Sequence, residues 1–346
     1  MKSHFSKYVI IGAGLSGLST AYQLYTQGET DFVILESRDR IGGRILTHDH
    51  IDLGATWFQN HHQNVLALLD ELQLKKFYQY SKGKSVLVYN SMAPEHYFEN
   101  DPNAPSAYRI AGGSVALINA LAAPFRDQIL TSGPVTAITA SEETLAVTTS
   151  KGIYTGEKVV VCIPPKITTR IAFSPELPDQ LTLAMEKTHT WMSNAMKIGM
   201  TFSSPFWRTK NLSGTVIGQV GAVTELYDHS DAADENYALM GFINEGLRDV
   251  SAEARKERIL AYLSKYLGPE LLNYQRYEEK DWSQDLNTSS ETIKSIYMSP
   301  SYGNPLFAAT YMNNRLVFAS AETAPIHGGY MDGAIYSGIQ AAKKCL

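Results

Sequence analysis

The first 36 residues constrain the fold more than any other stretch of the chain. An apolar run, Tyr8–Ile11, leads directly into the glycine-rich turn of residues 12–17, and a second apolar run, Phe32–Leu35, ends at Glu36. Between the two runs, apolar residues recur at helical spacing until Gly28, a residue suited to the end of a helix. This order predicts a strand–helix–strand unit of the kind that builds parallel sheets.

The spacing of three glycines within this unit predicts a dinucleotide site. Gly12 allows a tight turn, Gly14 lets a pyrophosphate approach the backbone, and Gly17 lets helix and strand pack closely. The partly positive N-terminus of the helix then faces the phosphates. Glu36 follows Gly17 by about 20 residues, where a carboxylate accepts hydrogen bonds from ribose hydroxyls. The pattern does not separate NAD from FAD.

Composition excludes several other classes of protein. The 346 residues correspond to about two domains, and the apolar fraction of 44% and charged fraction of 19% are those of an ordinary globular chain. The net charge of -5 is not the signature of a nucleic-acid binder. Cys162 and Cys345 form neither a disulfide framework nor a metal-binding cluster, so we expect a reducing, cytoplasmic setting and no metal.

No apolar run has the 18 or so residues of a membrane span, and we expect no membrane association. The run at residues 8–11 starts too early for a signal peptide, so we interpret it as a strand. Further strands are expected at residues 135–138, 145–149, 159–163, 197–202 and 316–319, and helices at 64–74, 114–121 with Ser114 as cap, 252–267 and 333–342. Residues 80–108 have no clear period and are expected to be irregular.

The segment after the second strand carries a family resemblance. Residues 36–44 read Glu-Ser-Arg-Asp-Arg-Ile-Gly-Gly-Arg, an acidic residue followed by a basic run and then Gly42-Gly43-Arg44. This resembles the signature of flavin-dependent amine oxidases, in which the loop wraps the FAD pyrophosphate. Arg44 is a fork-shaped donor and the two glycines expose backbone N–H groups, as such a contact needs.

Three later blocks strengthen the resemblance. Residues 54–57, Gly-Ala-Thr-Trp, resemble the family segment beside the isoalloxazine ring, and residues 318–324 resemble the segment whose glutamate, here Glu322, bonds the ribityl chain. Residues 329–334 resemble the closing motif, which opens a helix aimed at the flavin. The family also implies that Val135 contacts the adenine and that Trp282 lies against the flavin.

The resemblance implies an α/β fold with a Rossmann-like FAD-binding domain of the GR2 type and a second, mixed-sheet substrate domain. The FAD-binding domain is expected to be discontinuous, over residues 1–75, 107–186 and 288–346, with the substrate domain at 76–106 and 187–287. The residues expected to bind the cofactor are Gly12, Ala13, Gly14, Leu15, Ser16, Gly17, Glu36, Ser37, Arg38, Gly42, Gly43, Arg44, Gly54, Ala55, Thr56, Trp57, Val135, Trp282, Glu322 and Met331.

Two residues are expected to be catalytic. Lys197 interrupts an otherwise apolar strand, and lysine is rarely buried without a partner; the matching lysine of the family holds a water near flavin N5 and is linked to reoxidation. Tyr330 matches one of two aromatic walls that enclose the substrate amine. The second wall is expected near Glu291-Thr292, where no aromatic stands, and Tyr297 or Tyr302 are substitutes.

The implied reaction transfers a hydride from the carbon α to an amine, or amino acid, onto flavin N5, after which oxygen reoxidises the flavin and yields hydrogen peroxide. Because no cysteine stands where some relatives attach the cofactor, we expect non-covalent FAD. Two alternatives remain open. One is a flavoprotein of the same fold with another substrate, such as a renalase-like enzyme acting on nicotinamides, a desaturase or a porphyrinogen-type oxidase; the other is a flavin-binding protein without catalysis.

The chain lacks a segment that longer members of the family carry. Only about 55 residues separate Trp57 from Gly112, where relatives have helices that roof the substrate cavity. We therefore expect a shallower and more open site. His48, His50, His61 and His62 are expected at the surface, and His327 is a candidate gate beside the flavin.

Overall fold

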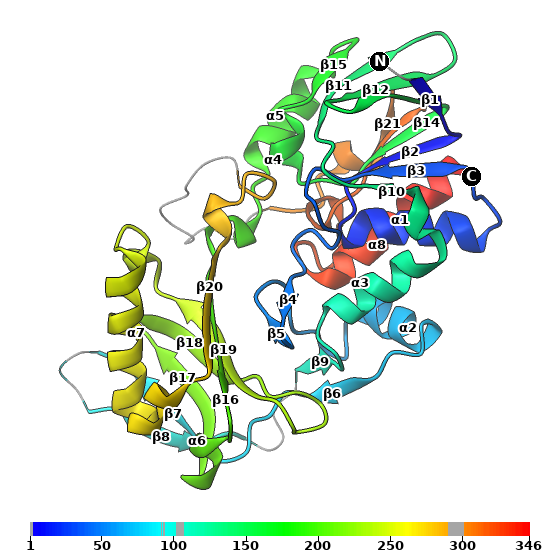
Figure 1. The fold of residues 1–346 in the computed structure, drawn as a ribbon. Coiled ribbons are helices and arrows are strands. Elements are labelled where there is room, and N and C mark those ends of the chain that lie inside the picture. Colours follow the sequence, from blue (N-terminus) through cyan, green and yellow to red (C-terminus); the bar gives the residue numbers. More distant parts are fainter. Residues whose placement is uncertain (1–2, 91, 93, 102–106, 290–300) are drawn as a thin grey trace.

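The predicted strand–helix–strand unit forms the centre of the larger part of the molecule (Figure 1). The structure is a computed structural model that describes residues 3–90, 92, 94–101, 107–289 and 301–346. Strand β2 (Tyr8–Ile11) runs parallel to β3 (Phe32–Leu35), and helix α1 (Leu15–Thr26) connects them. All four residues of β2 are buried, as expected for a strand covered on both faces.

These strands belong to a six-stranded sheet that joins distant parts of the chain. Its order is β10-β3-β2-β14-β22-β21, with the added strands β10 (Ile129–Leu130), β14 (Lys158–Val161), β22 (Leu316–Phe318) and β21 (Thr310–Tyr311). Only β21 is antiparallel to its neighbour. Helix α8 (Met331–Cys345) packs against α1, where a Cβ on Gly338 would lie 2.4 Å from the carbonyl oxygen of Ser16. The C-terminal segment therefore completes the layer that the N-terminal segment begins.

Two more helices and a second sheet cover this unit. Helices α2 (Gln63–Glu71) and α3 (Val115–Ala122) lie on the side of α1 and α8 (Figure 1). The five-stranded sheet has the order β1-β13-β12-β11-β15, and its residues Ile138 and Val147 share a core with Val9 and Ile11 of β2. Its strands are β1 (Ser3–Phe5), β13 (Gly152–Gly156), β12 (Leu145–Thr149), β11 (Val135–Ala140) and β15 (Ala172–Ser174).

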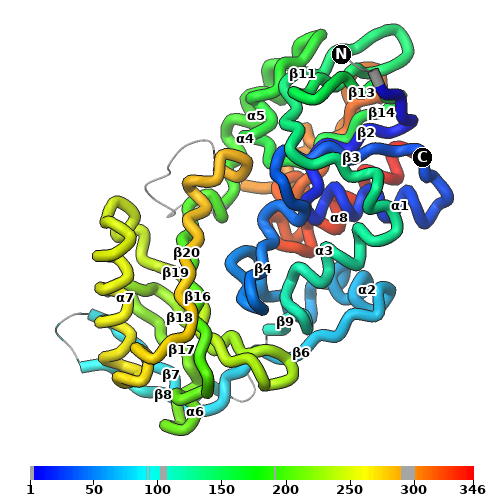
Figure 2. The backbone as a smooth tube through the Cα atoms, in the orientation of Figure 1, coloured from blue at the N-terminus to red at the C-terminus, as the bar shows by residue number. Residues whose placement is uncertain are grey.

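A seven-stranded sheet forms the other part of the molecule, with the order β20-β16-β19-β18-β17-β7-β8. Helix α7 (Ala252–Leu267) covers its outer face, on the side away from the six-stranded sheet (Figure 2). The strands are β20 (Arg276–Asp281), β16 (Met196–Phe202), β19 (Tyr237–Ile243), β18 (Val223–Asp228), β17 (Leu212–Gly218), β7 (Lys84–Val88) and β8 (His96–Glu99).

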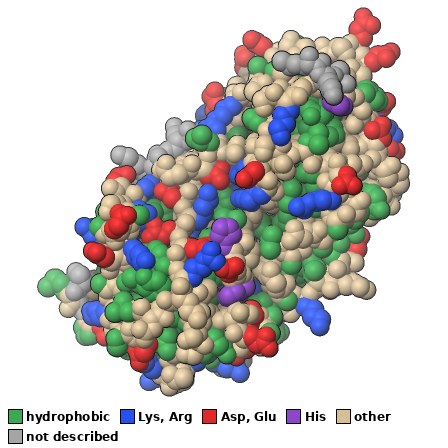
Figure 3. Space-filling model, in the orientation of Figure 1, with side chains coloured by type: hydrophobic (Ala, Val, Ile, Leu, Met, Phe, Trp, Pro, Cys, Tyr) green, Lys and Arg blue, Asp and Glu red, His purple; other side chains and the backbone are tan. Residues whose placement is uncertain are grey.

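The remaining elements are short. They are β4 (Thr47–His48), β5 (Ile51–Asp52), β6 (Lys76–Tyr78), β9 (Tyr108–Ile110), α4 (Pro165–Thr168), α5 (Asp179–Lys187), α6 (Phe206–Thr209) and 3-10 helices at Ala123–Gln128, Trp191–Asn194, Glu245–Leu247, Pro269–Asn273, Trp282–Gln284, Pro305–Ala308 and Ala321–Thr323. No helix in the described part of the chain combines the length and apolar character needed to cross a membrane. Positive and negative side chains are interspersed on the face drawn in Figure 3.

Two sequence predictions about local structure are wrong. The described part of residues 80–108 is not all irregular, because β7 and β8 lie within it and β9 (Tyr108–Ile110) begins at its last residue. Strand β7 pairs with β17, more than 120 residues later, and β8 is a short, mostly exposed edge strand, so no local period reveals them. Ser114 does stand before α3, but its side chain makes no capping bond to the helix; the backbone N–H of Ser114 instead donates to the carboxylate of Asp52 at 2.9 Å.

Candidate functional site

One cavity of about 1110 Å³ runs from the carboxyl end of the six-stranded sheet to the seven-stranded sheet. It is lined by the glycine-rich turn, the loop after β3, the segment after β5, the start of β11, part of the seven-stranded sheet and the start of α8. Sixteen of the predicted cofactor residues line it: Gly12, Gly14, Leu15, Ser16, Glu36, Ser37, Arg38, Gly42, Gly43, Arg44, Gly54, Ala55, Thr56, Trp57, Val135 and Met331.

The glycine-rich turn has the shape that a phosphate group needs. Gly12 has a φ of +103°, and a Cβ on Gly17 would lie 1.9 Å from the carbonyl oxygen of Gly12, so neither position tolerates a side chain. Gly43 lies against Gly14, where a Cβ on Gly43 would be 3.2 Å from the Gly14 Cα atom. Within the described residues no side chain caps α1, so its first N–H groups remain available on the cavity side.

The carboxylate of Glu36 lies at the end of β3 with only 2% of the residue exposed. It accepts hydrogen bonds from the backbone N–H groups of Ala13 and Arg38, each at 2.8 Å. The neighbouring Arg38 donates to Asp285 at 2.6 Å and to Thr288 at 2.9 Å, while its buried Nε atom has no hydrogen-bond partner among the described residues. The cavity therefore ends in a fixed carboxylate beside an unused donor, which fits the ribose and phosphates of a dinucleotide.

Arg44 is held by a buried carboxylate. Its guanidinium donates to both carboxylate oxygens of Glu322, and one of these bonds, from Nη2, measures 3.0 Å. Burial alone would raise the pKa of Glu322, but the adjacent charge of Arg44 and its hydrogen bonds bring the pKa below the ordinary value. Glu322 is fully buried and does not line the cavity, so its contact with a ribityl chain stays a prediction.

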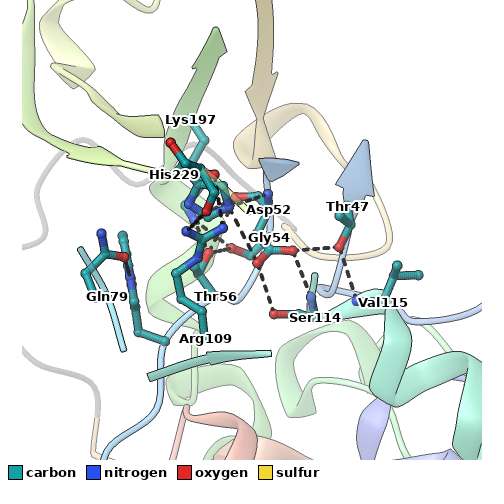
Figure 4. Close-up of polar contacts among 12 residues, drawn as sticks. Thr47, Asp52, Gly54, Thr56, Gln79, Arg109, Ser114, Val115, Lys197 and His229 are labelled. Carbon is teal, nitrogen blue, oxygen red and sulfur yellow. Dashed lines mark hydrogen bonds and ion pairs between the residues drawn. The ribbon is translucent and has the colours of Figure 1, made fainter. Parts of the chain in front are cut away.

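Lys197 reaches across from β16 to the segment that follows β5 (Figure 4). Its Nζ atom donates to the carbonyl oxygen of Gly54 at 2.6 Å, to that of Asp52 at 3.3 Å and to the Thr56 hydroxyl at 3.0 Å. Gly54 is required at this crossing, since a Cβ there would lie 2.1 Å from the carbonyl oxygen of Arg44. Lys197 is therefore a buried lysine on a strand at the cavity wall, and its catalytic role stays a prediction.

Lys197 is poised between its two protonation states. Three acceptors surround Nζ and together suit a charged ammonium group. Burial nevertheless lowers the pKa of Lys197 to about 7, against the opposing effect of the Asp52 carboxylate. Near pH 7, a small electrostatic change at this position shifts the charge of Lys197.

A buried polar network that no sequence pattern predicts lies behind Lys197 (Figure 4). Asp52 accepts hydrogen bonds from Thr47 at 2.6 Å and from the Ser114 N–H group, and its own N–H donates to His229 Nε2 at 3.0 Å. Arg109 donates to the backbone carbonyl oxygens of His229 and Ser230. Burial lowers the pKa of His229 to about 3, so its ring is neutral. The network fixes Asp52 near Lys197.

Four predicted cofactor residues do not line the cavity: Ala13, Gly17, Trp282 and Glu322. The first two shape the turn from behind. Trp282 is fully buried, donates from Nε1 to the carbonyl oxygen of Leu53 at 2.8 Å and packs with Met192 and Ala195. Trp282 therefore lies behind the residues that line the cavity, because its indole hydrogen bond holds the ring against the backbone of Leu53.

The cavity wall contains aromatic residues from both parts of the molecule. Tyr330, at the start of α8, lines it and is 53% exposed, and the open site stays a prediction. Trp57 and Phe242 also line it, with their ring centroids 5.3 and 4.9 Å from Lys197 Nζ. The expected second wall at Glu291-Thr292, with its substitute Tyr297, lies outside the described residues. Tyr302 is not among the lining residues.

The prediction that His62 lies at the surface is wrong. His62 is 4% exposed, lines the cavity and packs near Tyr330, with 5.3 Å between the centroids of the two tilted rings. Burial lowers its pKa to about 4, so the ring is neutral at pH 7. His50 is half-buried, whereas His48 and His61 are exposed. The loop position of His62 gave no period from which its burial could be predicted.

Two carboxylates in the cavity were also missed. Glu225 of β18 and Glu245, just after β19, both line it. Glu225 accepts a hydrogen bond from Tyr227 at 3.0 Å and is near enough to raise the pKa of Lys197. Glu245 accepts a hydrogen bond from Asn194. Glu225 lies on β18 and Glu245 begins the 3-10 helix after β19, and only the folded sheet brings them to one wall.

Cys162 lines the cavity at the end nearest Gly12, while Cys345 is buried elsewhere. Burial raises the pKa of Cys162 to about 12, which leaves its thiol protonated and unreactive. The position of Cys162 beside the glycine-rich turn places it at the phosphate end of the cavity.

Comparison with known proteins agrees with this arrangement. The sequence profile of the family described as flavin containing amine oxidoreductase matches residues 15–104 and 83–346. The chain is 26% identical to a probable flavin-containing monoamine oxidase A of Dictyostelium discoideum, over 97% of this chain and 96% of that protein. It is 30% identical to an L-amino acid dehydrogenase of Synechocystis sp. over 69% of this chain and 51% of that protein.

Solved structures show the same fold. A wild-type putrescine oxidase bound to putrescine superposes with a TM-score of 0.85 at 21% identity, covering 99% of both chains. The family match identifies FAD as the cofactor of the present chain. Three features fit the dinucleotide part of FAD: the uncapped N-terminus of α1, the close pair Gly14 and Gly43, and the carboxylate of Glu36. The chain therefore belongs to the family of flavin-containing amine oxidoreductases.

Proposed function

We propose that this protein is an FAD-dependent amine oxidase that binds its cofactor non-covalently and takes a cationic amine as substrate. The observation that carries the proposal is the continuity of the cavity. The same space that begins at Gly14 and Glu36 ends against Lys197, Trp57 and the carboxylate of Glu225. A dinucleotide at one end and a small amine at the other are thereby in contact.

We assign the six-stranded and five-stranded sheets to the FAD-binding domain, at residues 1–75, 107–186 and 288–346. The seven-stranded sheet belongs to the substrate domain, at 76–106 and 187–287. The strands β7 and β16 to β20 support this division, since all of them pair within the seven-stranded sheet. The substrate then enters between the sheets, where residues of both line one wall.

When bound, FAD supplies the redox step, by accepting a hydride from the carbon α to the amine and passing the electrons to oxygen to give hydrogen peroxide. The residues of the chain hold and orient the groups that react. Arg38 and the first turn of α1 bind the phosphates, and Glu36 accepts from the ribose. Gly54, Ala55 and Thr56 would present backbone and small side chains to the ring, and the N-terminus of α8 at Met331 would face it.

The substrate end of the cavity favours a cation. The rings of Trp57 and Tyr330 attract an ammonium group through their electron-rich faces, and Glu225 and Glu245 add two negative charges. A substrate with a second cationic group away from the reacting carbon makes use of all four residues. The amine group that reacts must itself be neutral. Because the pKa of Lys197 is lowered to about 7, part of the protein has a neutral Lys197 at pH 7, which reduces the positive charge near the reacting amine.

Lys197 acts at the oxygen-dependent half of the reaction. Its ammonium group lies beside Gly54 and Thr56, in the segment expected to lie along the flavin ring. A fixed positive charge here stabilises the negative charge that develops as oxygen is reduced. In the neutral state, Nζ keeps two N–H groups and gains a lone pair, which can accept a hydrogen bond from a water molecule and so orient it.

The test is an anaerobic screen of the purified, FAD-loaded protein. Amines, diamines, amino acids, nicotinamides and alcohols are added in turn, and bleaching of the flavin absorbance is followed. Bleaching by cationic amines, with peroxide formed when air is admitted, is the expected result. Bleaching only by nicotinamides or alcohols would assign the same fold to another reaction, and no bleaching by any compound would leave a flavin-binding protein without this catalysis.

A further inference from the structure

Three histidine rings meet beside Tyr330. His61 and His62 precede α2, and His327 precedes α8, so two loops that are distant in the sequence supply them. The ring centroids of His61 and His62 are 4.4 Å apart, and His327 lies 5.2 and 4.9 Å from them. One nitrogen from each ring lies within 4.8 Å of the others.

We propose that these three histidines form a binding site for a divalent transition-metal ion of the Zn²⁺ type, beside the cavity wall that His62 lines. Imidazole nitrogens suit Zn²⁺, Co²⁺ and Ni²⁺, and three of them with one water complete a four-coordinate shell. The proposal does not depend on the amine oxidase activity, because it concerns binding alone.

An independent feature supports the site. His327 shares its Nδ1 proton with the carboxylate of Asp332 at 2.8 Å, which leaves Nε2 of the same ring as a lone-pair donor. Carboxylates fix metal-binding histidines in this way and increase their basicity. Asp332 is itself buried and held by the backbone N–H groups of Asn64 and Val65, at 2.7 and 3.0 Å. It ties the loop of His327 to the helix that follows His61 and His62.

The three rings differ in how freely they can move. His62 is buried, and its Nδ1 atom accepts a hydrogen bond from the Gln59 N–H group at 3.2 Å. Coordination by His62 gives up this long bond with either ring nitrogen. A metal ion on Nδ1 takes the lone pair that accepts from Gln59, and a metal ion on Nε2 leaves the ring proton on Nδ1, which then cannot accept. His61 is exposed and can rotate. The three ring nitrogens lie within 4.8 Å of one another, and they must come closer together to bind one ion. We expect His61 to make most of this movement.

Occupation of the site has a consequence for the substrate. The centroid of His62 is 5.3 Å from that of Tyr330, so the ion lies next to the aromatic wall proposed to bind the amine. A divalent cation at this position repels a cationic amine. We therefore expect bound metal to raise the KM for a cationic amine more than it lowers kcat.

The experiment uses the FAD-loaded protein purified without an affinity tag. Zn²⁺ binding is measured by calorimetry, and Co²⁺ binding by its ligand-field absorption at wavelengths longer than those that oxidised flavin absorbs. We expect one ion per chain, with no comparable binding of Mg²⁺, which prefers oxygen ligands. His61→Ala and His327→Ala should each weaken binding at least about tenfold, and Asp332→Asn about 10- to 100-fold.

His96→Ala is the matched control, since His96 is an exposed histidine of the edge strand β8, and its binding should equal that of the unchanged protein. FAD content and thermal unfolding show whether each variant is folded, and the exposed His61 is the substitution least able to disturb the core. Failure of the unchanged protein to bind Zn²⁺ at millimolar concentration overturns the proposal. Binding that the His61→Ala and His327→Ala proteins retain in full overturns it equally. Neither result affects the proposed oxidase activity.

Discussion

The Nζ atom of Lys197 lies 2.6 Å from the carbonyl oxygen of Gly54. Lys197 belongs to the seven-stranded sheet, whereas Gly54 follows β5 in the part of the chain that contains the glycine-rich turn. This bond connects the two walls of the cavity at the place where cofactor and substrate are proposed to meet. The strength of this hydrogen bond depends on whether Lys197 is charged, and burial lowers the pKa of Lys197 to about 7.

Replacing Lys197 with Met should slow reoxidation of the flavin by oxygen by about 100-fold, because a fixed charge or a water at this position contributes that much to charge stabilisation. FAD should remain bound, since Lys197 is not expected to contact the dinucleotide. The oxidative and reductive half-reactions are measured separately by stopped-flow absorbance. Lys187→Met, at an exposed position of α5, serves as the control. An oxidative half-reaction at the unchanged rate would remove Lys197 from the mechanism.

Asp52→Asn should move the pH dependence of reoxidation toward acid. The Asp52 carboxylate raises the pKa of Lys197, so its removal lowers this pKa further below about 7. The midpoint of the reoxidation rate against pH then shifts down, whichever form of Lys197 is the active one. Thr47→Val removes a hydrogen bond to Asp52 without removing the charge, and its midpoint should stay in place. A midpoint common to both variants would contradict the role given to Asp52.

Glu36→Ala should weaken FAD binding by about 10- to 100-fold, the range for loss of a hydrogen bond to a charged group. The carboxylate also holds the backbone of Ala13 and Arg38, so the variant loosens the turn as well as the ribose contact. Fluorescence titration of the protein freed of flavin measures the affinity. Glu29→Ala, which breaks a surface ion pair with Lys7, is the comparison, and equal affinities in the two variants would refute the assignment.

Glu322→Gln should destabilise the protein by about 3 to 5 kcal/mol, because it leaves Arg44 without its buried counter-charge. The pKa of Glu322 is lower in the folded protein than its ordinary value. Its contribution to stability is therefore fully present above the ordinary pKa and is lost as the pH falls through the folded pKa. Thermal unfolding from neutral to acid pH should show a smaller gap between the two proteins at the acid end. A gap that is constant with pH would exclude the ion pair as the cause.

Glu225→Gln should raise the KM for a cationic amine about tenfold with a smaller effect on kcat, since the lost charge acts on binding. Glutamine keeps the size of the side chain and can still accept the bond from Tyr227. The exposed Glu142→Gln is the control. Steady-state kinetics measure KM and kcat of both variants and of the unchanged protein with a monoamine and with a diamine. An unchanged KM for both substrates would show that the Glu225 carboxylate does not contact the amine.

The sequence alone determined the features whose chemistry is local. Gly12, Gly14 and Gly17 follow a strand and open a helix within one short stretch, and Glu36 ends the next strand, so spacing was enough to predict the dinucleotide end of the cavity. Lys197 was recognisable for a related reason, since a charge within an apolar strand is conspicuous without knowledge of its neighbours.

The tertiary structure decided what depends on residues far apart in the chain. In the folded chain His62 is buried against Tyr330, Trp282 lies behind the cavity wall, and β7 pairs with β17. No hydrophobic periodicity in the sequence predicts these three contacts. The tertiary structure also placed Asp52, His229 and Glu225 around Lys197. The pKa of a buried lysine follows from the sum of desolvation and nearby charges, and that sum exists only once the sheets have closed around it.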